Sequence, residues 1–481
     1  MRSIPEELAD ALELHKAGRV AQAEDVYREI LQRDPDNPDA LHMLGVAAAQ
    51  SGQPEAALRH IARAITLNPA PAYYHNNLGN VLHHLDRFTE ALLCYQEALR
   101  LDPDYAEAHS NLANTLTELG RLGEALPHHL EAVRLKPDFA QGYASLGSTL
   151  RAQGLYADAA ACYEEALRLN PGDADAHAGR ATLWLLAGDY TRGWLEYEWR
   201  WMAKGFTGRR IEGALWDGSA AAGLRILLHA EQGLDDTIQF IRYVPLVKHS
   251  GATVLVECQP RLAPLLALMP EIDRLIPAGS ALPYFDAHLP LLSLPRVFKT
   301  TLESIPRIVP YLRVPPEKAE RWRYRLPGDG RRKVGLAWAG NPEYKNDRNR
   351  SVPLSEFAPL GRVRGVRFFS LQRPGDDGAP PPEGLELESL ETESGEITDT
   401  AAALLSLDLV ISVDTMVAHL AGALGVPLWT LLPWQADWRW LLDREDSPWY
   451  PTMRLFRQPA AGQWEPVMER LAEALQHAVC Q

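Results

Sequence analysis

Residues 410–427 read VISVDTMVAHLAGALGVP and place polar side chains directly after an apolar run. Asp414 and Thr415 end that run, and a stretch rich in small residues follows until Gly425 and Pro427 stop it. This order predicts a strand, a helix N-cap and a helix. The first N–H groups of such a helix are unpaired and lie at the positive end of the helix dipole, which suits a phosphate or diphosphate. The alternative is a capped helix that binds no ligand.

A cationic segment follows another predicted strand. Residues 339–350 read AGNPEYKNDRNR, and three cations stand close together in them, namely Lys345, Arg348 and Arg350. A further predicted strand, residues 366–372, ends in the polar side chains of Ser370 and Gln372. Because the carboxyl ends of parallel strands meet at one edge of a sheet, we expect these groups to lie near the predicted helix start and to bind a sugar nucleotide there. Otherwise the cationic segment is a solvated surface loop.

A pair of carboxylates follows the first predicted strand of the C-terminal half. Residues 231–236 read EQGLDD and lie between a strand predicted at 224–229 and a helix predicted at 237–247. Asp236 can cap the helix that is predicted to begin at Thr237. A carboxylate in an enclosed cleft can also accept a proton from a hydroxyl group, and the two roles are compatible.

The elements before these segments repeat with a period of 34 residues. The period is kept by small residues at Gly45, Gly79, Ala113 and Gly147, by alanines at Ala57, Ala91, Ala125 and Ala159 and at Ala64, Ala98, Ala132 and Ala166, and by prolines at Pro69, Pro103, Pro137 and Pro171. The pattern is typical of the tetratricopeptide repeat, in which paired amphipathic helices stack into a superhelix. Six units fit residues 4–204. The aromatic sixth unit, residues 189–201, is expected to cap the array and dock it onto the C-terminal half of the chain.

The first helix of each unit carries polar side chains at positions that the packing pattern does not need. They would line the inner groove of the superhelix: Asn76, Asn77, Asn80, Asn111, Asn114 and His109. Asparagine amides can bond the backbone of an extended peptide, so we expect the groove to bind a protein or peptide. A solvated polar face is the alternative.

Beyond residue 223, strands alternate with helices, which implies parallel sheets. We therefore predict a multidomain α + α/β chain with four parts: the repeat array at 4–204, a linker at 205–223, a first Rossmann-like lobe at 224–326 and a second at 327–481. An amphipathic helix predicted at 463–479 closes the chain, and such a helix often returns to the first lobe.

Two stretches resemble a known family. EQGLDDTIQFIRYVPLV at 231–247 and DTMVAHLAGALGVP at 414–427 are similar to the bacterial tetratricopeptide-containing glycosyltransferases, relatives of the heptosyltransferases of glycosyltransferase family 9. The resemblance implies a GT-B fold, with an acceptor lobe and a nucleotide-sugar lobe facing each other across a cleft. It implies a general base at Asp236, and donor contacts at Asp414, Thr415, His419, Arg348 and Gln372, with Arg350 as the second choice for the cation.

The chain departs from this family at Asp235, where the family has glycine. Glycine serves where φ is positive or where a ligand approaches the backbone closely. Aspartate tolerates left-handed conformations better than most residues, but it adds a second carboxylate beside Asp236. Like charges this close should raise the pKa of one of them. Reduced activity, or none, is one expected consequence.

Composition narrows the class of protein. A net charge of −15 argues against a general nucleic-acid surface. The four cysteines are far apart and form no CxxC, which favours a reducing compartment over disulfides or a zinc site. Because the N-terminus has no apolar core of signal-peptide type and no apolar run reaches about 18 residues, we expect a cytoplasmic protein without a membrane span, although peripheral membrane association stays open. No segment looks like a DxD metal-binding loop, so neither a metal nor a cofactor is expected.

Three functions fit these observations. The first is a glycosyltransferase that moves a sugar from a nucleotide-sugar donor to a protein or peptide offered by the repeats. The second is a transferase of a small or lipid-linked glycan, with the repeats used only for assembly. The third is a non-catalytic interaction scaffold with degenerate transferase lobes, which Asp235 favours.

Overall fold

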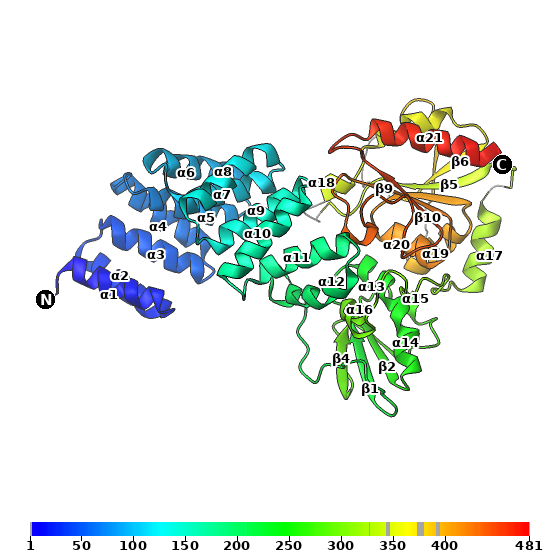
Figure 1. The fold of residues 1–481 in the computed structure, drawn as a ribbon, viewed down its shortest axis with the longest axis horizontal. Helices are drawn as coiled ribbons and strands as arrows, with labels where there is room; N and C mark the ends of the chain where they lie inside the picture. The colour runs from blue at the N-terminus through cyan, green and yellow to red at the C-terminus, as the bar shows by residue number, and fades with distance from the viewer. Residues whose placement is uncertain are drawn as a thin grey trace. The chain divides into compact units, whose positions relative to one another are not determined.

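The computed structural model describes residues 2–206, 208–326, 328–342, 347–372, 380–390 and 395–480, and the side chain of Arg348 is also outside this description. The chain divides into two compact units, Met1–Gly179 and Arg180–Gln481 (Figure 1). The predicted boundary of the repeat array at residue 204 therefore lies inside the second unit.

Paired helices follow the 34-residue period of the sequence. The first helices of the pairs are α1 (Ile4–Lys16), α3 (Pro38–Gln50), α5 (Ala72–His84), α7 (Ala106–Glu118), α9 (Ala140–Ala152) and α11 (Ala174–Leu186). The second helices are α2 (Val20–Arg33), α4 (Pro54–Leu67), α6 (Phe88–Leu101), α8 (Leu122–Leu135), α10 (Tyr156–Leu169) and α12 (Tyr190–Glu196). The predicted helical repeat architecture is confirmed, and α11 spans the boundary between the units.

Small residues let the two helices of a pair approach closely. A Cβ at Gly79 would lie 2.6 Å from the ring of Tyr95, and one at Gly147 would lie 2.9 Å from the ring of Tyr163. The tyrosines then bond back across the pair, Tyr95 Oη donating to Asn80 Oδ1 at 2.8 Å. The glycine period in the sequence thus reports a packing contact between a backbone and an aromatic ring.

The second unit begins its first sheet after residue 224. Its strands are β1 (Arg225–His229), β2 (Thr253–Cys258), β3 (Arg274–Pro277) and β4 (Ala287–Pro290), all parallel and in the order β3-β2-β1-β4. Between and after them lie α13 (Leu234–Phe240), η2 (Ile241–Tyr243), α14 (Val244–His249), α15 (Ala263–Leu266), η3 (Leu291–Ser293) and α16 (Leu294–Val297). Part of the predicted linker belongs to this lobe, because Trp216 is buried and its backbone N–H donates to His288 O of β4.

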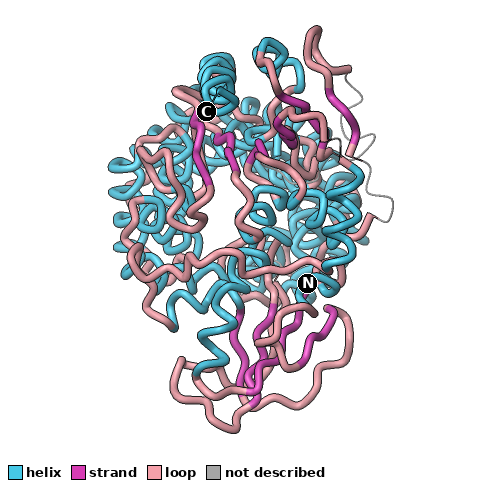
Figure 2. The backbone as a smooth tube through the Cα atoms, turned by 90° about the vertical axis from the view of Figure 1, so that its right-hand side faces the viewer, coloured by secondary structure: helices cyan, strands magenta, loops and turns pink. Residues whose placement is uncertain are grey.

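The second sheet is also parallel. Its strands are β5 (Arg332–Ala337), β6 (Val366–Ser370), β7 (Leu387–Ser389), β8 (Leu409–Val413), β9 (Leu428–Leu432) and β10 (Met453–Arg457), in the order β10-β9-β8-β5-β6-β7. The sheet order reverses between β5 and β8. Figure 2 shows the strands of the two sheets as two separate groups.

The helices of the second sheet correct two expectations. They are α17 (Pro316–Arg325), α18 (Asp347–Arg350), η4 (Leu354–Arg362), α19 (Ile397–Leu405), α20 (Met416–Ala423), η5 (Trp438–Trp440) and α21 (Glu465–Cys480). Trp322 of α17 packs with Ala402 and Ala403 of α19, so α17 goes with the second lobe, where the predicted boundary at 326 would assign it to the first. The closing helix α21 packs on η4 and β10 of its own lobe and does not return to the first lobe, because its apolar face, including Leu471, completes the core of the second sheet.

The two lobes meet where α13 lies beside α20 (Figure 1). We call the contact of α13 and η2 with α20 and residues 437–450 the interlobe seam. The expected docking role of the aromatic sixth unit is visible here, since Trp194 of α12 packs edge-on against Phe240, Trp438 and Trp449. The helix of the last repeat is therefore part of the core between the lobes.

Candidate functional site

The loops after β5 and β8 meet at the point where the order of the second sheet reverses. Arg350 of α18 donates from Nη1 to the backbone oxygen of Asp414 at 2.9 Å. Its Nε also donates to Asp347 Oδ1 at 2.9 Å. The carboxyl edge of such a reversal is where open parallel sheets bind ligands. A guanidinium is therefore fixed beside the start of α20.

Gly340 makes room for this arrangement. A Cβ on Gly340 would collide with the carboxylate of Asp347 and lie 2.6 Å from Arg350 Nη2. The N–H of Gly340 donates to Ser351 Oγ at 3.0 Å, and Ser351 Oγ donates to Asp347 Oδ2 at 2.8 Å. The Asp347–Arg350 pair thus lies directly against the backbone of Gly340.

The start of α20 lacks a side-chain cap. Thr415 is the N-cap residue, but its side chain accepts no bond from the helix and lies 3.3 Å from Ser412 Oγ. Thr415 is 7% exposed. The first backbone N–H groups of this eight-residue helix are consequently not satisfied by Thr415, as expected for a site that takes an anion.

Asp414 is held by its own network. Trp440 Nε1 donates to Asp414 Oδ2 at 2.8 Å, and His419 Nε2 lies 3.6 Å from Asp414 Oδ1. Burial alone would raise the pKa of Asp414, but the interactions with His419 and Trp440 outweigh it and lower that pKa. His419 is 1% exposed and its Nδ1 lies 2.9 Å from Tyr450 Oη. In this conformation His419 positions Asp414 and has no surface left for the donor contact that the resemblance implies.

Of the other residues predicted to contact the donor, some are described by the structure and some are not. Gln372 accepts from Ala339 N through Oε1 at 3.2 Å, so it braces the loop after β5. Ser370 Oγ accepts from Gln372 N at 3.3 Å. Lys345 and the side chain of Arg348 lie outside the described residues. Arg350, the second choice for the cation, lies at the start of α20.

Asp236 lies on the first lobe at the seam. Its Oδ2 accepts from Gly233 N at 2.9 Å, which caps α13, and its Oδ1 pairs with Arg439 Nη2 of the second lobe. Burial raises the pKa of Asp236 to about 7; Arg439 acts against this rise and Asp235 adds to it. A carboxylate with this pKa is suited to proton transfer near neutral pH. The predicted helix start at Thr237 is therefore wrong: α13 begins at Leu234, and Asp236 caps it from within its first turn by bonding back to Gly233 N.

Asp235 does not strain the backbone. It lies in the first turn of α13, outside the left-handed region that would call for glycine. Its carboxylate folds over Gly233, where a Cβ would collide with it. The departure from the family therefore changes charge and bulk at the seam and leaves the backbone conformation unstrained.

Two buried arginines escape prediction from the sequence. Arg439 lies in η5, after β9, and Arg242 lies in η2. The tryptophan-rich composition of the segment after β9 favours core, and Trp438 and Trp440 are indeed buried. The sequence does place Arg439 in the segment after β9. Because β5, β8 and β9 are parallel, this segment leaves the same edge of the sheet as the loops after β5 and β8, which could have marked Arg439 as a residue near the site.

The asparagines of the repeat array form a hydrogen-bond ladder. Asn111 Nδ2 donates to Asn76 Oδ1 at 3.0 Å, Asn76 Nδ2 to Asn77 Oδ1 at 3.3 Å, and Asn77 Nδ2 lies 3.0 Å from His42 Nε2. Asn76 is 3% exposed, and Asn80 accepts from Tyr95. The reason given for these positions, that packing does not need them, is therefore wrong for Asn76, whereas Asn80 is exposed. Asn114 is half-buried, and His109 Nε2 bonds the carbonyl of Pro103 at 3.0 Å.

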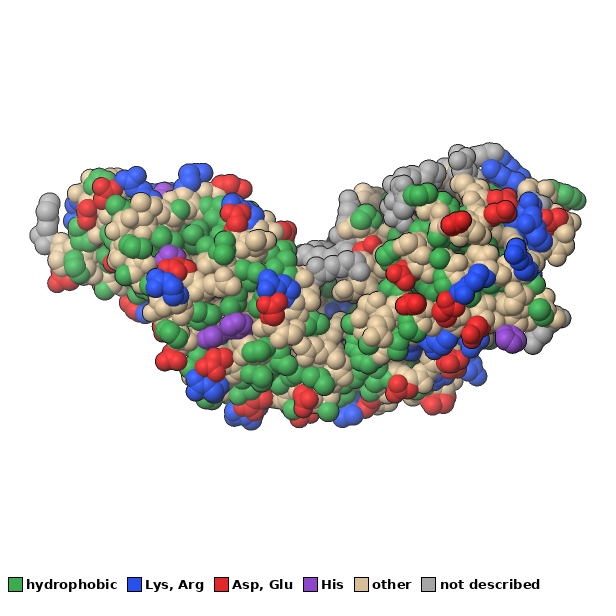
Figure 3. Space-filling model, turned by 90° about the horizontal axis from the view of Figure 1, so that it is seen from above, with side chains coloured by type: hydrophobic (Ala, Val, Ile, Leu, Met, Phe, Trp, Pro, Cys, Tyr) green, Lys and Arg blue, Asp and Glu red, His purple; other side chains and the backbone are tan. Residues whose placement is uncertain are grey.

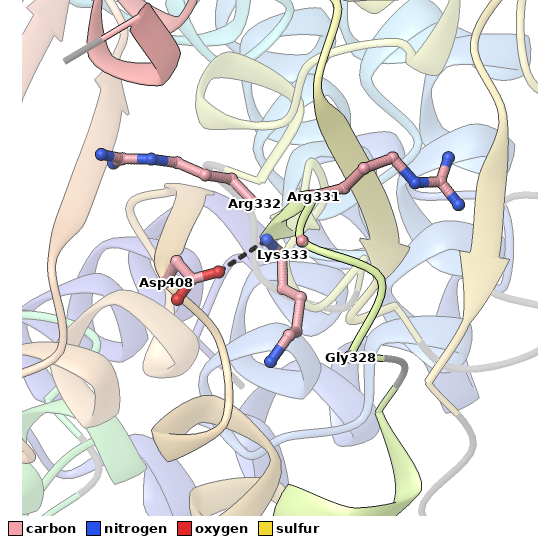
Figure 4. Close-up of a pocket in the computed structure, with 6 residues that line it drawn as sticks. Gly328, Arg331, Arg332, Lys333 and Asp408 are labelled. Carbon is pink, nitrogen blue, oxygen red and sulfur yellow. Dashed lines mark hydrogen bonds between the residues drawn. The ribbon is translucent and has the colours of Figure 1, made fainter.

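A cavity of about 600 Å³ opens at the amino end of β5, away from these loops. Figure 4 shows that Arg331, Arg332 and Lys333, which line it, point in different directions, while Asp408 accepts from Lys333 N at 2.8 Å. Cations that diverge do not form an anion site. On the face seen in Figure 3, acidic and basic side chains are mixed over the repeat array, in keeping with its ion pairs such as Arg134–Glu131.

The described residues show neither a metal site nor a membrane span. They contain no group of three or more His, Cys, Asp or Glu side chains placed to hold a metal ion. None of their helices combines the length and apolarity needed to cross a membrane.

Known protein families match the repeat region. Models described as "Tetratricopeptide repeat" match residues 14–78, 106–136 and 145–197, and one described as "TPR repeat" matches residues 82–120. Solved structures similar to this part include "Crystal structure of MamA" (23% identity, TM-score 0.31, covering 36% of this chain and 96% of that one) and "Functional Characterization of Pseudomonas Aeruginosa pilF" (20% identity, TM-score 0.37, covering 40% and 94%).

One relative extends over more of the chain. Protein FlbA of Caulobacter vibrioides (strain ATCC 19089 / CIP 103742 / CB 15) is 30% identical over 327 aligned residues, and the match covers 62% of this chain and 54% of FlbA. The chain thus matches about half the length of this relative. Residues 14–197 accordingly carry tetratricopeptide repeats, which indicate a protein or peptide partner, and a region of two parallel sheets follows them.

Proposed function

We propose that the chain is a glycosyltransferase, which moves a sugar from a nucleotide-sugar donor to an acceptor recruited as a protein or peptide by the repeats. The parallel order β10-β9-β8-β5-β6-β7 of the second sheet supports a Rossmann-like lobe, and the two lobes would form a GT-B pair. One observation carries the proposal: Arg350 lies at the start of α20 where the sheet order reverses, and a diphosphate would find there both a cation and helix N–H groups that the side chain of Thr415 does not cap.

The reaction follows from the two sides of the seam. The acceptor hydroxyl oxygen bonds to the anomeric carbon of the sugar while the bond from that carbon to the diphosphate oxygen breaks. Asp236 takes the hydroxyl proton, and the diphosphate leaves with the electron pair. Arg350 and the start of α20 stabilise the charge that develops on the leaving group, so the step as proposed needs no metal. The proposed compartment is the cytoplasm.

Donor binding is tested by thermal shifts with a panel of nucleoside diphosphates and sugar nucleotides. At least one should raise the melting temperature, and Arg350→Gln should weaken its binding about tenfold, because a charge-assisted contact is lost. Arg362→Gln, which removes a surface pair with Glu469, is the matched control and should bind normally. A panel that leaves the melting temperature unchanged would reject the transferase.

The general base is tested with the donor found in that panel, by mass spectrometry of transferred sugar. Asp236→Asn should lower the transfer rate about a thousandfold and keep the thermal shift. Asp273→Asn, which removes a surface carboxylate paired with Lys248, should transfer at the normal rate. Unchanged turnover in Asp236→Asn would remove Asp236 from the mechanism.

A second function has its own support. Both oxygens of Asp236 are already engaged, and Asp235 adds a carboxylate beside them. A non-catalytic scaffold, with the repeats binding a protein and the lobes degenerate, would show the same resting contacts. It predicts that no donor is consumed even when a nucleotide binds.

A further inference from the structure

Arg439 is a single side chain that ties the second lobe to the first. Its Nε donates to Gln239 Oε1 at 2.6 Å, its Nη1 to Asp437 Oδ1 at 2.8 Å, and its Nη2 to Asp236 Oδ1. Asp236 and Gln239 both belong to α13 of the first lobe. The guanidinium lies over the ring of Trp438, 4.3 Å from its centroid. Arg439 therefore bonds two residues of α13, Asp236 and Gln239, while its guanidinium packs on Trp438.

The contact with Arg439 engages the carboxylate of Asp236, the proposed general base. Oδ1 of Asp236 is paired with Arg439 and Oδ2 accepts from Gly233 N. Asp236 is 8% exposed, as is Arg439. A general base must come within hydrogen-bond distance of the hydroxyl whose proton it takes. As long as Arg439 stays in place, both carboxylate oxygens of Asp236 are engaged and the side chain is buried, so an acceptor hydroxyl cannot bond to it.

The same arginine lies within the electrostatic reach of the start of α20. The next residue, Trp440, donates to Asp414 Oδ2 at 2.8 Å, and the charge of Arg439 acts on Asp414. Next to Arg439, the Nε2 group of Gln239 is fully buried and has no hydrogen-bond partner in the described part of the chain. A buried donor of this kind costs stability until an acceptor arrives. Anionic oxygens near the start of α20 would attract Arg439 and offer such an acceptor.

We infer that Arg439 is a latch between the two substrates: it holds Asp236 in the donor-free protein, and the donor's diphosphate draws its guanidinium away, so that donor binding frees the base for the acceptor. The inference rests on the proposed function. It assigns Arg439 a regulatory position at the site, and it predicts that the acceptor reacts only after the donor has bound.

The test is carbodiimide labelling of carboxylates in the full chain, read at Asp236 by peptide mass spectrometry. Wild type without nucleotide should label slowly at Asp236. Arg439→Met should label it several-fold faster, and so should wild type with the nucleoside diphosphate that gives the largest thermal shift. Asp446, on the surface and paired with Arg444, serves as the internal reference. Arg362→Met, which loses a surface pair with Glu469, is the matched control and should leave Asp236 at the slow rate.

The outcomes separate the latch from the proposed function. Equal labelling of Asp236 in wild type and Arg439→Met would overturn the latch, whether or not a nucleotide binds. A nucleotide that binds and leaves the labelling of wild type slow would also overturn it, with the transferase intact. If no nucleotide shifts the melting temperature, the transferase fails, and the comparison of the two nucleotide-free proteins still decides whether Arg439 shields Asp236. Should Arg439→Met not fold, Arg439→Lys, which cannot make all three bonds, takes its place and should label at an intermediate rate.

Discussion

The repeat array and the interlobe seam bury polar groups in opposite ways. In the array such contacts recur with the period, as when Tyr95 bonds Asn80 at 2.8 Å and Tyr163 lies 3.1 Å from Ser148. At the seam each contact occurs once and joins distant segments, as when Arg439 meets Asp236, 203 residues away. Each polar contact of the array therefore has similar contacts in neighbouring repeats, whereas a contact of the seam is not repeated elsewhere. The loss of a seam contact should cost more and should depend more on its charge partners.

The largest effect is expected at Arg242. It donates to Trp449 O at 2.6 Å, to Gln239 O at 2.7 Å and to Tyr311 Oη at 2.9 Å, and its guanidinium lies over the ring of Tyr450. None of its hydrogen bonds in the described part of the chain goes to a carboxylate. Arg242→Met should lower the free energy of unfolding by about 3 kcal/mol, because carbonyls and an aromatic pocket lose their partner.

Calorimetry of Arg242→Met beside Arg444→Met measures this loss. Since no carboxylate is involved, the loss should stay constant between about pH 5 and pH 8. A loss that varies across this range would mean that an ionised partner holds Arg242 after all.

A smaller, pH-dependent loss is expected at Arg439. Burial already raises the pKa of Asp236 from an ordinary 3.8 to about 7, and Arg439 limits that rise. When the pKa of a carboxyl group is raised in the folded state, the free energy of unfolding of the protein falls as the pH rises from the unfolded-state pKa towards the folded-state pKa. Without Arg439 the pKa of Asp236 rises further. Near pH 8, one unit above the wild-type pKa, the free energy of unfolding of Arg439→Met should therefore lie up to about 1.4 kcal/mol further below that of wild type than it does near pH 5.

The double variant Arg439→Met with Asp236→Asn isolates this effect. Its stability relative to Asp236→Asn alone should hardly vary with pH. If the pH dependence survives in the double variant, Asp437 rather than Asp236 is the group that Arg439 holds.

The array should show a smaller effect that follows its period. His129 occupies the position of Tyr95 and Tyr163, and Ala113 the position of Gly79 and Gly147. Burial lowers the pKa of His129 to about 4, and neither ring nitrogen has a hydrogen-bond partner in the described residues. His129→Tyr alone should destabilise by about 1 kcal/mol, because the larger ring meets the Cβ of Ala113. His129→Tyr with Ala113→Gly should gain about 1 kcal/mol, since tyrosine can bond Asn114.

Chemical denaturation of the two single variants and the double variant measures this coupling. Additive changes would show that the glycine–tyrosine pairing of the neighbouring units is not a packing rule of this array.

The smallest effect concerns the pH profile of the proposed transfer. Asp235 raises the pKa of Asp236, so removing that charge should lower it. In Asp235→Gly the acidic limb of the transfer rate should move to lower pH by less than about one unit. Asp235→Asn should give the same shift if charge is the cause. A shift in Asp235→Gly alone would point to bulk over Gly233.

The repeats were predictable because periodicity carries both helix boundaries and helix contacts. Strands such as β1, β2 and β8 were predictable because each is a short apolar run, and Thr415 could be placed at a helix start from the same pattern. The strands β7 and β10 were not predicted, since LES and MRLFR are not apolar runs. The contacts of the interlobe seam were not predictable, because Arg439 and Arg242 bond to residues that only the packing of the two lobes brings close to them. Asn76 escaped prediction for the same reason, because its partner Asn111 lies on another helix, 35 residues on. His419 matches a motif, but its burial depends on Tyr450, which belongs to a segment whose sequence indicates only core.

The position of α12 limits how freely this chain can be cut. Tyr190 and Trp194 are buried against Trp449, so a protein shortened to begin at residue 205 would leave Phe240, Trp438 and Trp449 facing water. Such a fragment should aggregate, whereas one that begins at Ala174 keeps α11 whole together with the second unit. Recombination that exchanges repeats between relatives should therefore join ahead of α11, so that the last repeat is inherited together with the lobes.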